Sequence, residues 1–85
     1  MKSHDLKIKP CFFRDVINGK KTFEIRYDDR GYKVGDILIL REFDEGYTGF
    51  VAAVEVTSLL KDFEGLKPGF VIMSIKVQCG YKITI

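Results

Sequence analysis

The segment from Gly19 to Arg26 carries the polar side chains best suited to binding chemistry. It reads Gly-Lys-Lys-Thr-Phe-Glu-Ile-Arg, so a glycine is followed by two ammonium groups, a carboxylate and a guanidinium. In an extended strand alternate residues share a face, which places Thr22, Glu24 and Arg26 together. Lysine binds phosphate as a point charge, arginine binds it through a planar fork, and a carboxylate accepts hydrogen bonds from exocyclic amines. The segment therefore predicts a cleft that binds nucleic acid or a nucleotide.

The competing interpretation is a solvated outer strand face. Alternating charges on a strand commonly form exposed ion pairs, each worth about 0–1 kcal/mol. Spacing alone favours this simpler interpretation. The formal net charge of only +2 excludes a strongly basic nucleic-acid binder. Residues 1–41 nevertheless hold ten Lys/Arg against six acids, whereas residues 42–85 hold four against six, so the first half is suited to an anionic ligand.

Further residues are candidates for the rim of this cleft. Lys20 sits at its predicted mouth and Arg30 in the polar turn that follows, which completes the predicted nucleic-acid-binding set of Lys20, Lys21, Glu24, Arg26 and Arg30. Aromatic rings stack on bases, which makes candidates of Tyr27, Tyr32 and Tyr47, although tyrosines more often pack at the edge of a core. The single histidine, His4, is either a cleft residue or a structural one at the start of a strand.

Length and composition limit the class of protein. The 85 residues predict one domain over residues 1–85, and no apolar run approaches the ~20 residues of a membrane helix. The first residues lack an apolar signal region, so we expect a cytoplasmic protein with no membrane partner. One histidine and two cysteines, Cys11 and Cys79, predict no metal site and no cofactor, and the cysteines are expected to be reduced and mostly buried.

Hydrophobic periodicity predicts a mainly β fold with one or two short helices. Pro10 suits the first helical position and Gly19 the residue after a helix end, so a helix is expected over residues ~10–18. The run Ile37–Leu40 is apolar on both faces and predicts a fully buried strand. Turns are expected at Asp28–Gly31 and Lys33–Asp36, and a hairpin loop at Phe43–Thr48. The other expected strands are His4–Lys9, Lys21–Tyr27, Phe50–Ser58, Phe70–Val77 and a short final one at Tyr81–Ile85.

Five or six strands of this length predict a small closed or nearly closed β-barrel. An irregular connection is expected over Leu60–Gly69, which contains two glycines and a proline. Asp36 is expected to bond backbone N–H groups in its own turn as a structural residue. The predicted core includes Phe12, Phe13, Phe23, Ile25, Leu38 and Leu40.

The ordered run of short motifs along the chain resembles the ASCH domain (activating-signal-cointegrator homology), of the short single-domain bacterial and phage type. The family motif G-x-K-x-x-E-x-R falls on Gly19, Lys21, Glu24 and Arg26, and all four positions match. The motifs that carry the resemblance are His4-x-Leu6-Lys7-Ile8-x-Pro10-x-Phe12-Phe13, Gly19-x-Lys21-Thr22-Phe23-Glu24-Ile25-Arg26, Asp29-Arg30, Val34-Gly35-Asp36-x-Leu38-x-Leu40 and Tyr47-Thr48-Gly49. The resemblance covers roughly the whole chain.

The resemblance implies a PUA-like β-barrel with a helix beside a cleft, and an RNA- or nucleotide-binding function. An alternative is a small amidohydrolase acting on an acylated modified nucleoside, as in some very small ASCH proteins. Those use Lys and Thr in a G-x-K-x-x-T motif and a late-strand Glu; here Lys21 matches, Glu24 replaces the Thr, and Phe70–Val77 holds no acid. Lys21 and Glu24 are the catalytic candidates if the protein is an enzyme. A third possibility is a protein-interaction module of a transcription or translation regulator, with an apolar patch at Leu59–Phe70.

Overall fold

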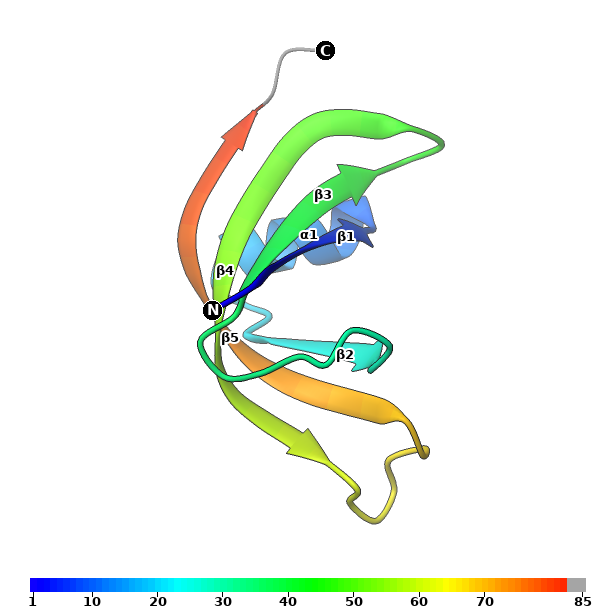
Figure 1. Cartoon of the computed structure of the whole chain (residues 1–85). Helices are drawn as coiled ribbons and strands as arrows, with labels where there is room; N and C mark the ends of the chain where they lie inside the picture. Colours follow the sequence, from blue (N-terminus) through cyan, green and yellow to red (C-terminus); the bar gives the residue numbers. More distant parts are fainter. Residues whose placement is uncertain (83–85) are drawn as a thin grey trace.

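Three short strands and one helix precede two long strands along the chain. The structure, a computed structural model, describes residues 1–82. In chain order the elements are β1 (Ser3–Ile8), α1 (Pro10–Ile17), β2 (Phe23–Tyr27), β3 (Ile37–Phe43), β4 (Tyr47–Lys61) and β5 (Phe70–Lys82). Figure 1 shows how β4 and β5 bend along their length, so that the sheet curls into a half-barrel. The prediction of a mainly β fold with one short helix is confirmed.

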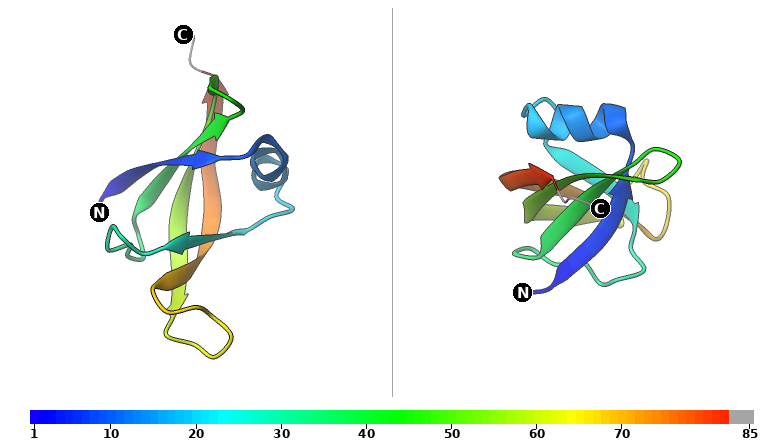
Figure 2. Two further views of the ribbon diagram at one scale, coloured as in Figure 1. Left: turned by 90° about the vertical axis from the view of Figure 1, so that its right-hand side faces the viewer. Right: turned by 90° about the horizontal axis from the view of Figure 1, so that it is seen from above.

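One mixed sheet holds all five strands in the order β1-β3-β4-β5-β2. Only β1 and β3 are parallel; the other neighbours pair in antiparallel fashion. β1 and β2 are therefore the two edge strands, and both lie on the same side of β4 and β5 with α1 beside them (Figure 2). Within residues 1–82, no backbone ladder joins β1 to β2, so the barrel is closed only halfway.

Local signals place the helix and the turns as predicted. α1 begins at Pro10, and the chain leaves it through Gly19, whose φ of 74° is the left-handed conformation that favours glycine. In the first turn Asp28 Oδ1 accepts the N–H of Gly31 over 2.9 Å, and in the second Asp36 N–H donates to Lys33 O over 3.0 Å. The ends of the strands differ more from the predicted ends. β4 extends well beyond the predicted Phe50–Ser58, because β5 pairs with it along its length.

The predicted final strand at Tyr81–Ile85 is not a separate element where the structure describes it. Tyr81 and Lys82 continue β5, and the last three residues of that prediction lie outside the described residues. The loop before β5 covers residues 62–69, close to the predicted irregular connection. Among residues 1–82 there is no helix with the length and apolar composition needed to cross a membrane.

The core fills the concave side of the half-barrel and is closed by α1. Phe13 and Val16 of α1 are buried, as are Leu38 and Leu40 of β3. Ile37 and Ile39 are only half-buried, so β3 is not enclosed on both faces as predicted. The remaining members of the core cluster are Leu6, Ile8, Tyr32, Ala52, Val54, Val56, Val71, Met73 and Ile75.

The prediction for the inward face of β2 is wrong. Phe23 and Ile25 were expected in the core but are 42% and 48% exposed, whereas Glu24 is 3% exposed. The alternation itself is correct. Glu24 lies opposite Met73 of β5, a fully buried core residue, so the polar face of β2 points inward and its apolar face points outward.

Two further predictions about burial are wrong on α1 and its surroundings. Phe12 is 45% exposed, because α1 packs against the sheet through one face. That face includes the neighbouring Phe13 and leaves Phe12 outside the core. Cys11 and Cys79 are free thiols as expected, but both are exposed rather than buried.

Candidate functional site at the open edge of the half-barrel

A buried carboxylate at the inward face of β2 organises the candidate site. The Glu24 side chain is 5% exposed and accepts from Lys21 Nζ at 2.8 Å and from Arg26 Nε at 3.0 Å, one partner on each carboxylate oxygen. Charge-assisted hydrogen bonds of this kind are about twice as strong as neutral ones. The carboxylate thus fixes one ammonium and one guanidinium group beside each other at the surface of the sheet.

The end of α1 places Lys21 where strand alternation would not. Lys20 N and Lys21 N both donate to Asp15 O, at 2.8 and 2.9 Å, so the backbone folds back on the helix end before β2 begins at Phe23. Lys21 therefore stands outside the strand. Its Nζ also donates to Phe23 O at 2.6 Å, which holds the side chain along the start of β2 and toward Glu24.

These residues lie in a depression of about 620 Å³, which we name the Lys21 depression. That volume falls in the range of about 300–1,000 Å³ typical of small-molecule sites. Its charged lining is Lys7, Lys9, Lys20, Lys21 and Arg26 against Asp15 and Glu24. The lining therefore holds five basic and two acidic side chains, which leaves an excess of positive charge. The count includes Glu24 and the two basic residues that it pairs with.

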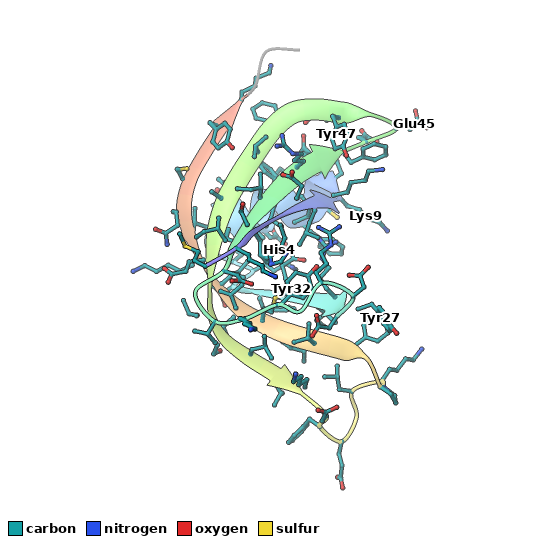
Figure 3. The ribbon with its side chains drawn as sticks, in the orientation of Figure 1. His4, Lys9, Tyr27, Tyr32, Glu45 and Tyr47 are labelled. Atoms are coloured by element: carbon teal, nitrogen blue, oxygen red, sulfur yellow. The ribbon has the colours of Figure 1, made fainter. Side chains whose placement is uncertain are left out.

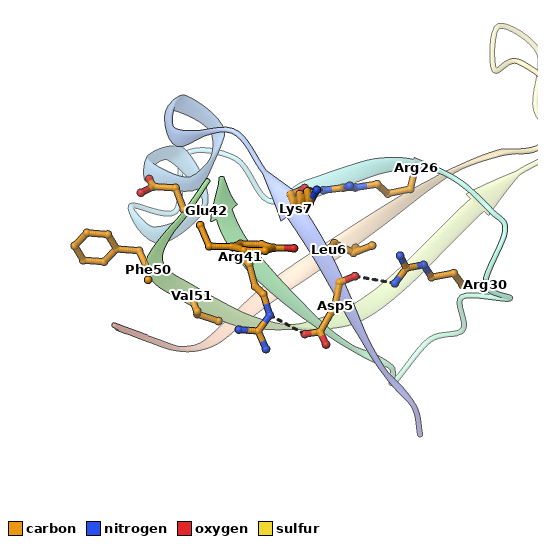
Figure 4. A pocket seen from close by; sticks show the side chains of 11 residues that line it. Asp5, Leu6, Lys7, Arg26, Arg30, Arg41, Glu42, Phe50 and Val51 are labelled. Atoms are coloured by element: carbon orange, nitrogen blue, oxygen red, sulfur yellow. Dashed lines mark hydrogen bonds and ion pairs between the residues drawn. The ribbon is translucent and has the colours of Figure 1, made fainter. Parts of the chain in front are cut away.

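A second depression of about 570 Å³, which we name the Tyr47 depression, lies over β1 and the start of β4 (Figure 4). Its charged lining is Lys7, Arg26, Arg30 and Arg41 against Asp5 and Glu42. Asp5 holds two of these arginines: its Oδ1 accepts from Arg41 Nε at 3.1 Å and its backbone O from Arg30 Nη1 at 2.7 Å. Lys7 and Arg26 line both depressions.

Exposed aromatic rings accompany the basic groups in each depression. Lys21 Nζ lies 4.9 Å from the ring centroid of Phe23 and 5.6 Å from that of Phe12, and both rings line the Lys21 depression. In the neighbouring depression Lys7 Nζ lies 5.8 Å from the Tyr47 ring, which packs edge-on against Phe43. Lysine over an aromatic face is a cation–π contact worth about 0.5–1 kcal/mol at exposed sites.

The structure brings together four of the five residues predicted from the sequence. Lys20, Lys21, Glu24 and Arg26 all line the Lys21 depression, whereas Arg30 lies in the other one. Sequence reasoning missed Lys7, Lys9 and Arg41. The first two alternate with the buried residues of β1, a pattern visible in the sequence, but nothing there indicated that β1 approaches β2.

His4 is a structural residue and not part of either depression. Its Nε2 lies 2.9 Å from Asp36 Oδ2, both side chains are buried, and the Tyr32 ring packs edge-on against the imidazole (Figure 3). Asp36 also accepts the backbone N–H groups of Lys2 and Lys33, so its predicted structural role is confirmed. The hydrogen bond from His4, with the two backbone bonds, lowers the pKa of Asp36 to about 2.

Of the three tyrosines that are candidates for stacking on bases, two pack against other residues and one lines a depression. Burial raises the pKa of Tyr32, which belongs to the core, and Tyr27 packs edge-on against Phe70 away from both depressions (Figure 3). Only Tyr47 lines a depression. As for metals, no three His, Cys, Asp or Glu side chains of residues 1–82 are grouped so that they could hold an ion.

Comparison with known proteins gives the chain a family. It is 39% identical over 59 residues to an Escherichia phage P2 protein described as "Uncharacterized 12.9 kDa protein in GpA 3'region". The match covers 68% of this chain and 54% of the phage protein, so the chain spans about half the length of this curated relative. The family model described as "Domain of unknown function (DUF3850)" matches residues 3–75, a span that contains every residue lining the two depressions. The chain therefore belongs to the DUF3850 family.

Proposed function

We propose that the Lys21 depression binds RNA or a nucleotide. The observation that carries the proposal is the buried Glu24 carboxylate, which orients Lys21 and Arg26 at the wall of a depression that holds five basic and two acidic side chains. Basic side chains that neutralise phosphates supply most of the affinity of sequence-independent nucleic-acid binding. Because Lys21 and Arg26 are already held in place, a phosphate pays less conformational entropy to engage them.

The aromatic lining supports a nucleotide over other anions. Phe12 and Phe23 are 45% and 42% exposed although each is large and apolar. Proteins that bind single-stranded nucleic acid stack bases on such rings next to a positively charged groove. Glu24 retains lone pairs beyond those used by Lys21 and Arg26, and these can accept from an exocyclic amine of a base.

The family motif agrees with this assignment. We propose that the chain is related to the ASCH domain through Gly19, Lys21, Glu24 and Arg26, which match G-x-K-x-x-E-x-R. The relationship implies a β-barrel with a helix beside a cleft, and the half-barrel with α1 beside a depression is a more open form of that architecture. The RNA-binding proposal for the ASCH domain points to the same residues. The membership in DUF3850 supplies no function of its own, so the site's chemistry carries the argument.

The hydrolase alternative has no supporting observation. Lys21 Nζ already donates to Glu24 Oε1 and Phe23 O. β5 carries no carboxylate from Phe70 to Lys82 that could complete a catalytic set. We expect no turnover when the protein is incubated with acylated nucleosides.

One observation supports the alternative of a protein-interaction module. An apolar surface lies outside the basic lining of the two depressions. Leu60 and Phe63 are 42% and 59% exposed, in the region where the sequence predicted a patch, and the outward face of β2 exposes Tyr27 as well. A surface of this kind favours protein contact. Sedimentation over a range of concentrations tests whether the chain associates with itself through it.

Titration of the purified protein with labelled RNA tests the main proposal. Single-stranded RNA, duplex RNA and nucleoside monophosphates are compared at about 50 and about 200 mM salt, because phosphate contacts weaken as counterions are added. Lys20→Ala removes an exposed cation that lines the depression, and Lys67→Ala removes an exposed cation outside it. We expect weaker binding and a shallower salt dependence for Lys20→Ala alone. Equal affinity of the two variants, or no binding of any ligand, refutes the proposal.

A further inference from the structure

The Lys21 depression and the Tyr47 depression adjoin at the open edge of the half-barrel, and together we name them the track. Arg26 Nη2 donates to Lys7 O at 2.9 Å, and both residues line both depressions. The contact between β2 and β1 therefore borders both depressions, and we name it the Lys7–Arg26 ridge. Each depression, at about 620 and about 570 Å³, has the size of a site for one small ligand.

Each side of the ridge repeats the same pair of chemical features. The Lys21 depression has the exposed rings of Phe12 and Phe23, and the Tyr47 depression has that of Tyr47, which is 50% exposed. Each side also has cations of its own in addition to the shared ridge. A single nucleotide would occupy one side and leave the equivalent features of the other without a role.

The arginines of the Tyr47 depression are held ready for a ligand. Asp5 fixes Arg41 through Nε and Arg30 through Nη1, and in the described part of the chain no hydrogen bond uses Nη1 or Nη2 of Arg41. The terminal nitrogens of Arg41 are the pair that binds a phosphate oxygen pair in parallel. A guanidinium that is already oriented loses less conformational freedom when it binds.

We infer that the track binds an extended single strand of RNA across at least two successive nucleotides, with one base in each depression and the intervening phosphate over the Lys7–Arg26 ridge. The inference rests on the proposed function and selects a strand over a free nucleotide. The phosphate meets the Arg26 guanidinium at the ridge, while the Lys7 ammonium lies on the Tyr47 side, 4.3 Å from the Phe43 ring centroid. Each base meets an exposed ring face. A duplex cannot present its bases in this way, because they are stacked on one another and paired.

The experiment compares the affinity of RNA ligands of increasing length. A nucleoside monophosphate, a dinucleotide, a trinucleotide and a hexanucleotide are titrated into the intact protein, with duplex RNA as a further ligand. We expect an increase of roughly tenfold from the monophosphate to the dinucleotide, the size of one added stacking contact. Chemical-shift mapping of the wild type with the dinucleotide should perturb backbone amides on both sides of the ridge, for example those of Phe23 and Gly49.

Two substitutions separate the depressions. Phe12→Ala and Tyr47→Leu should each weaken dinucleotide binding roughly tenfold. Only Phe12→Ala should weaken binding of the monophosphate, because a single nucleotide is expected in the Lys21 depression. Tyr47→Leu keeps apolar volume against Phe43, so the hairpin stays packed. Phe63→Ala, an exposed ring outside both depressions, serves as the control and should change neither affinity.

The outcomes distinguish this inference from the proposal on which it rests. Binding of the monophosphate as tight as that of the dinucleotide, or shifts confined to one side of the ridge, overturns the two-nucleotide track while leaving nucleotide binding intact. Duplex RNA bound as tightly as single strands also overturns it. Absence of binding to every RNA and nucleotide overturns the proposed function itself.

Discussion

Arg26 of β2 donates from Nη2 to the backbone oxygen of Lys7 in β1, over 2.9 Å, and so ties together the two edges of the sheet. Two residues earlier in β1, the oxygen of Asp5 accepts from Arg30 Nη1 at 2.7 Å. Carbonyls two residues apart point to the same side of a strand. Two guanidinium groups thus occupy the free edge of β1, where a further strand would bond in a closed barrel.

We expect Arg26→Lys to lower the free energy of unfolding by about 1.5–3 kcal/mol, the value of a hydrogen bond to a charged group. Lysine keeps the positive charge but cannot reach Glu24 and Lys7 O together, since it lacks the planar fork. Urea unfolding measures the effect. Arg14→Lys on the exposed face of α1 is the control and should leave stability within about 0.5 kcal/mol. Equal stability of both variants would contradict a structural role for the bridge.

Glu24→Ala should lower the free energy of unfolding by about 2–3 kcal/mol, because it leaves Lys21 and Arg26 as neighbouring like charges. The side chains of these two residues are 16% and 25% exposed, which allows partial rehydration and keeps the loss below the roughly 3–5 kcal/mol of fully buried pairs. The loss should shrink as salt is raised, since salt screens the repulsion. A loss that does not change between low and high salt would show that packing, not charge, is the function of Glu24.

The Asp36 carboxyl should make stability depend on pH in the acid range. The hydrogen bond from His4 and two backbone N–H groups lower its pKa from 3.8 to about 2, so the folded state favours the ionised form. The stabilisation, about 2 kcal/mol, is complete above the ordinary pKa and is lost as pH falls from about 4 toward 2. Unfolding measured across that interval should show the loss.

Asp36→Asn tests whether the Asp36 carboxyl is the source of this loss of stability at acid pH. The amide cannot ionise, so the variant should be less stable at neutral pH and its stability should vary less between pH about 4 and about 2. Asp44→Asn, in the exposed turn between β3 and β4, is the control and should retain the full pH dependence. Parallel pH profiles for the wild type and Asp36→Asn would rule out Asp36 as the titrating group.

The neighbouring rings of α1 should differ sharply in their contribution to stability. Phe13 is 7% exposed and should cost about 3–5 kcal/mol when truncated to alanine, whereas Phe12, 45% exposed, should cost about 1 kcal/mol or less. Thermal unfolding and urea unfolding compare the two variants. Similar losses for both would mean that α1 packs with a different face against β3 and β5.

Local patterns in the sequence predicted most of the elements correctly. Pro10 and Gly19 bound the helix because their backbone preferences act on the residues next to them, and Asp36 closes its turn for the same reason. The alternation of Phe23, Glu24 and Ile25 was also readable. Its direction was not, because alternation defines two faces without stating which one meets the core.

The direction of β2 was decided by its pairing with β5. Glu24 lies opposite the buried Met73, and the carboxylate tolerates that position because Lys21 and Arg26 complete its hydrogen bonds. Sequence reasoning assigned the apolar side inward because burying Phe23 and Ile25 releases more apolar surface from water than burying a carboxylate. A paired charge overrides that preference, and the pairing depends on residues brought together by folding.

The sequence by itself determined the cluster from Lys20 to Arg26, since one helix end and one short strand suffice to bring these residues together. The tertiary structure alone decided the rest of the site. Lys7 meets Arg26, and Asp5 meets Arg30 and Arg41, across separations of 19, 25 and 36 residues. The contacts of Lys7 with Arg26 and of Asp5 with Arg30 exist because the strand order β1-β3-β4-β5-β2 curls the two edge strands toward each other, whereas Asp5 meets Arg41 because β1 pairs with β3. Long-range strand pairing of that kind leaves no periodic trace in the chain, because periodicity records only which face of an element is buried and not which element it meets.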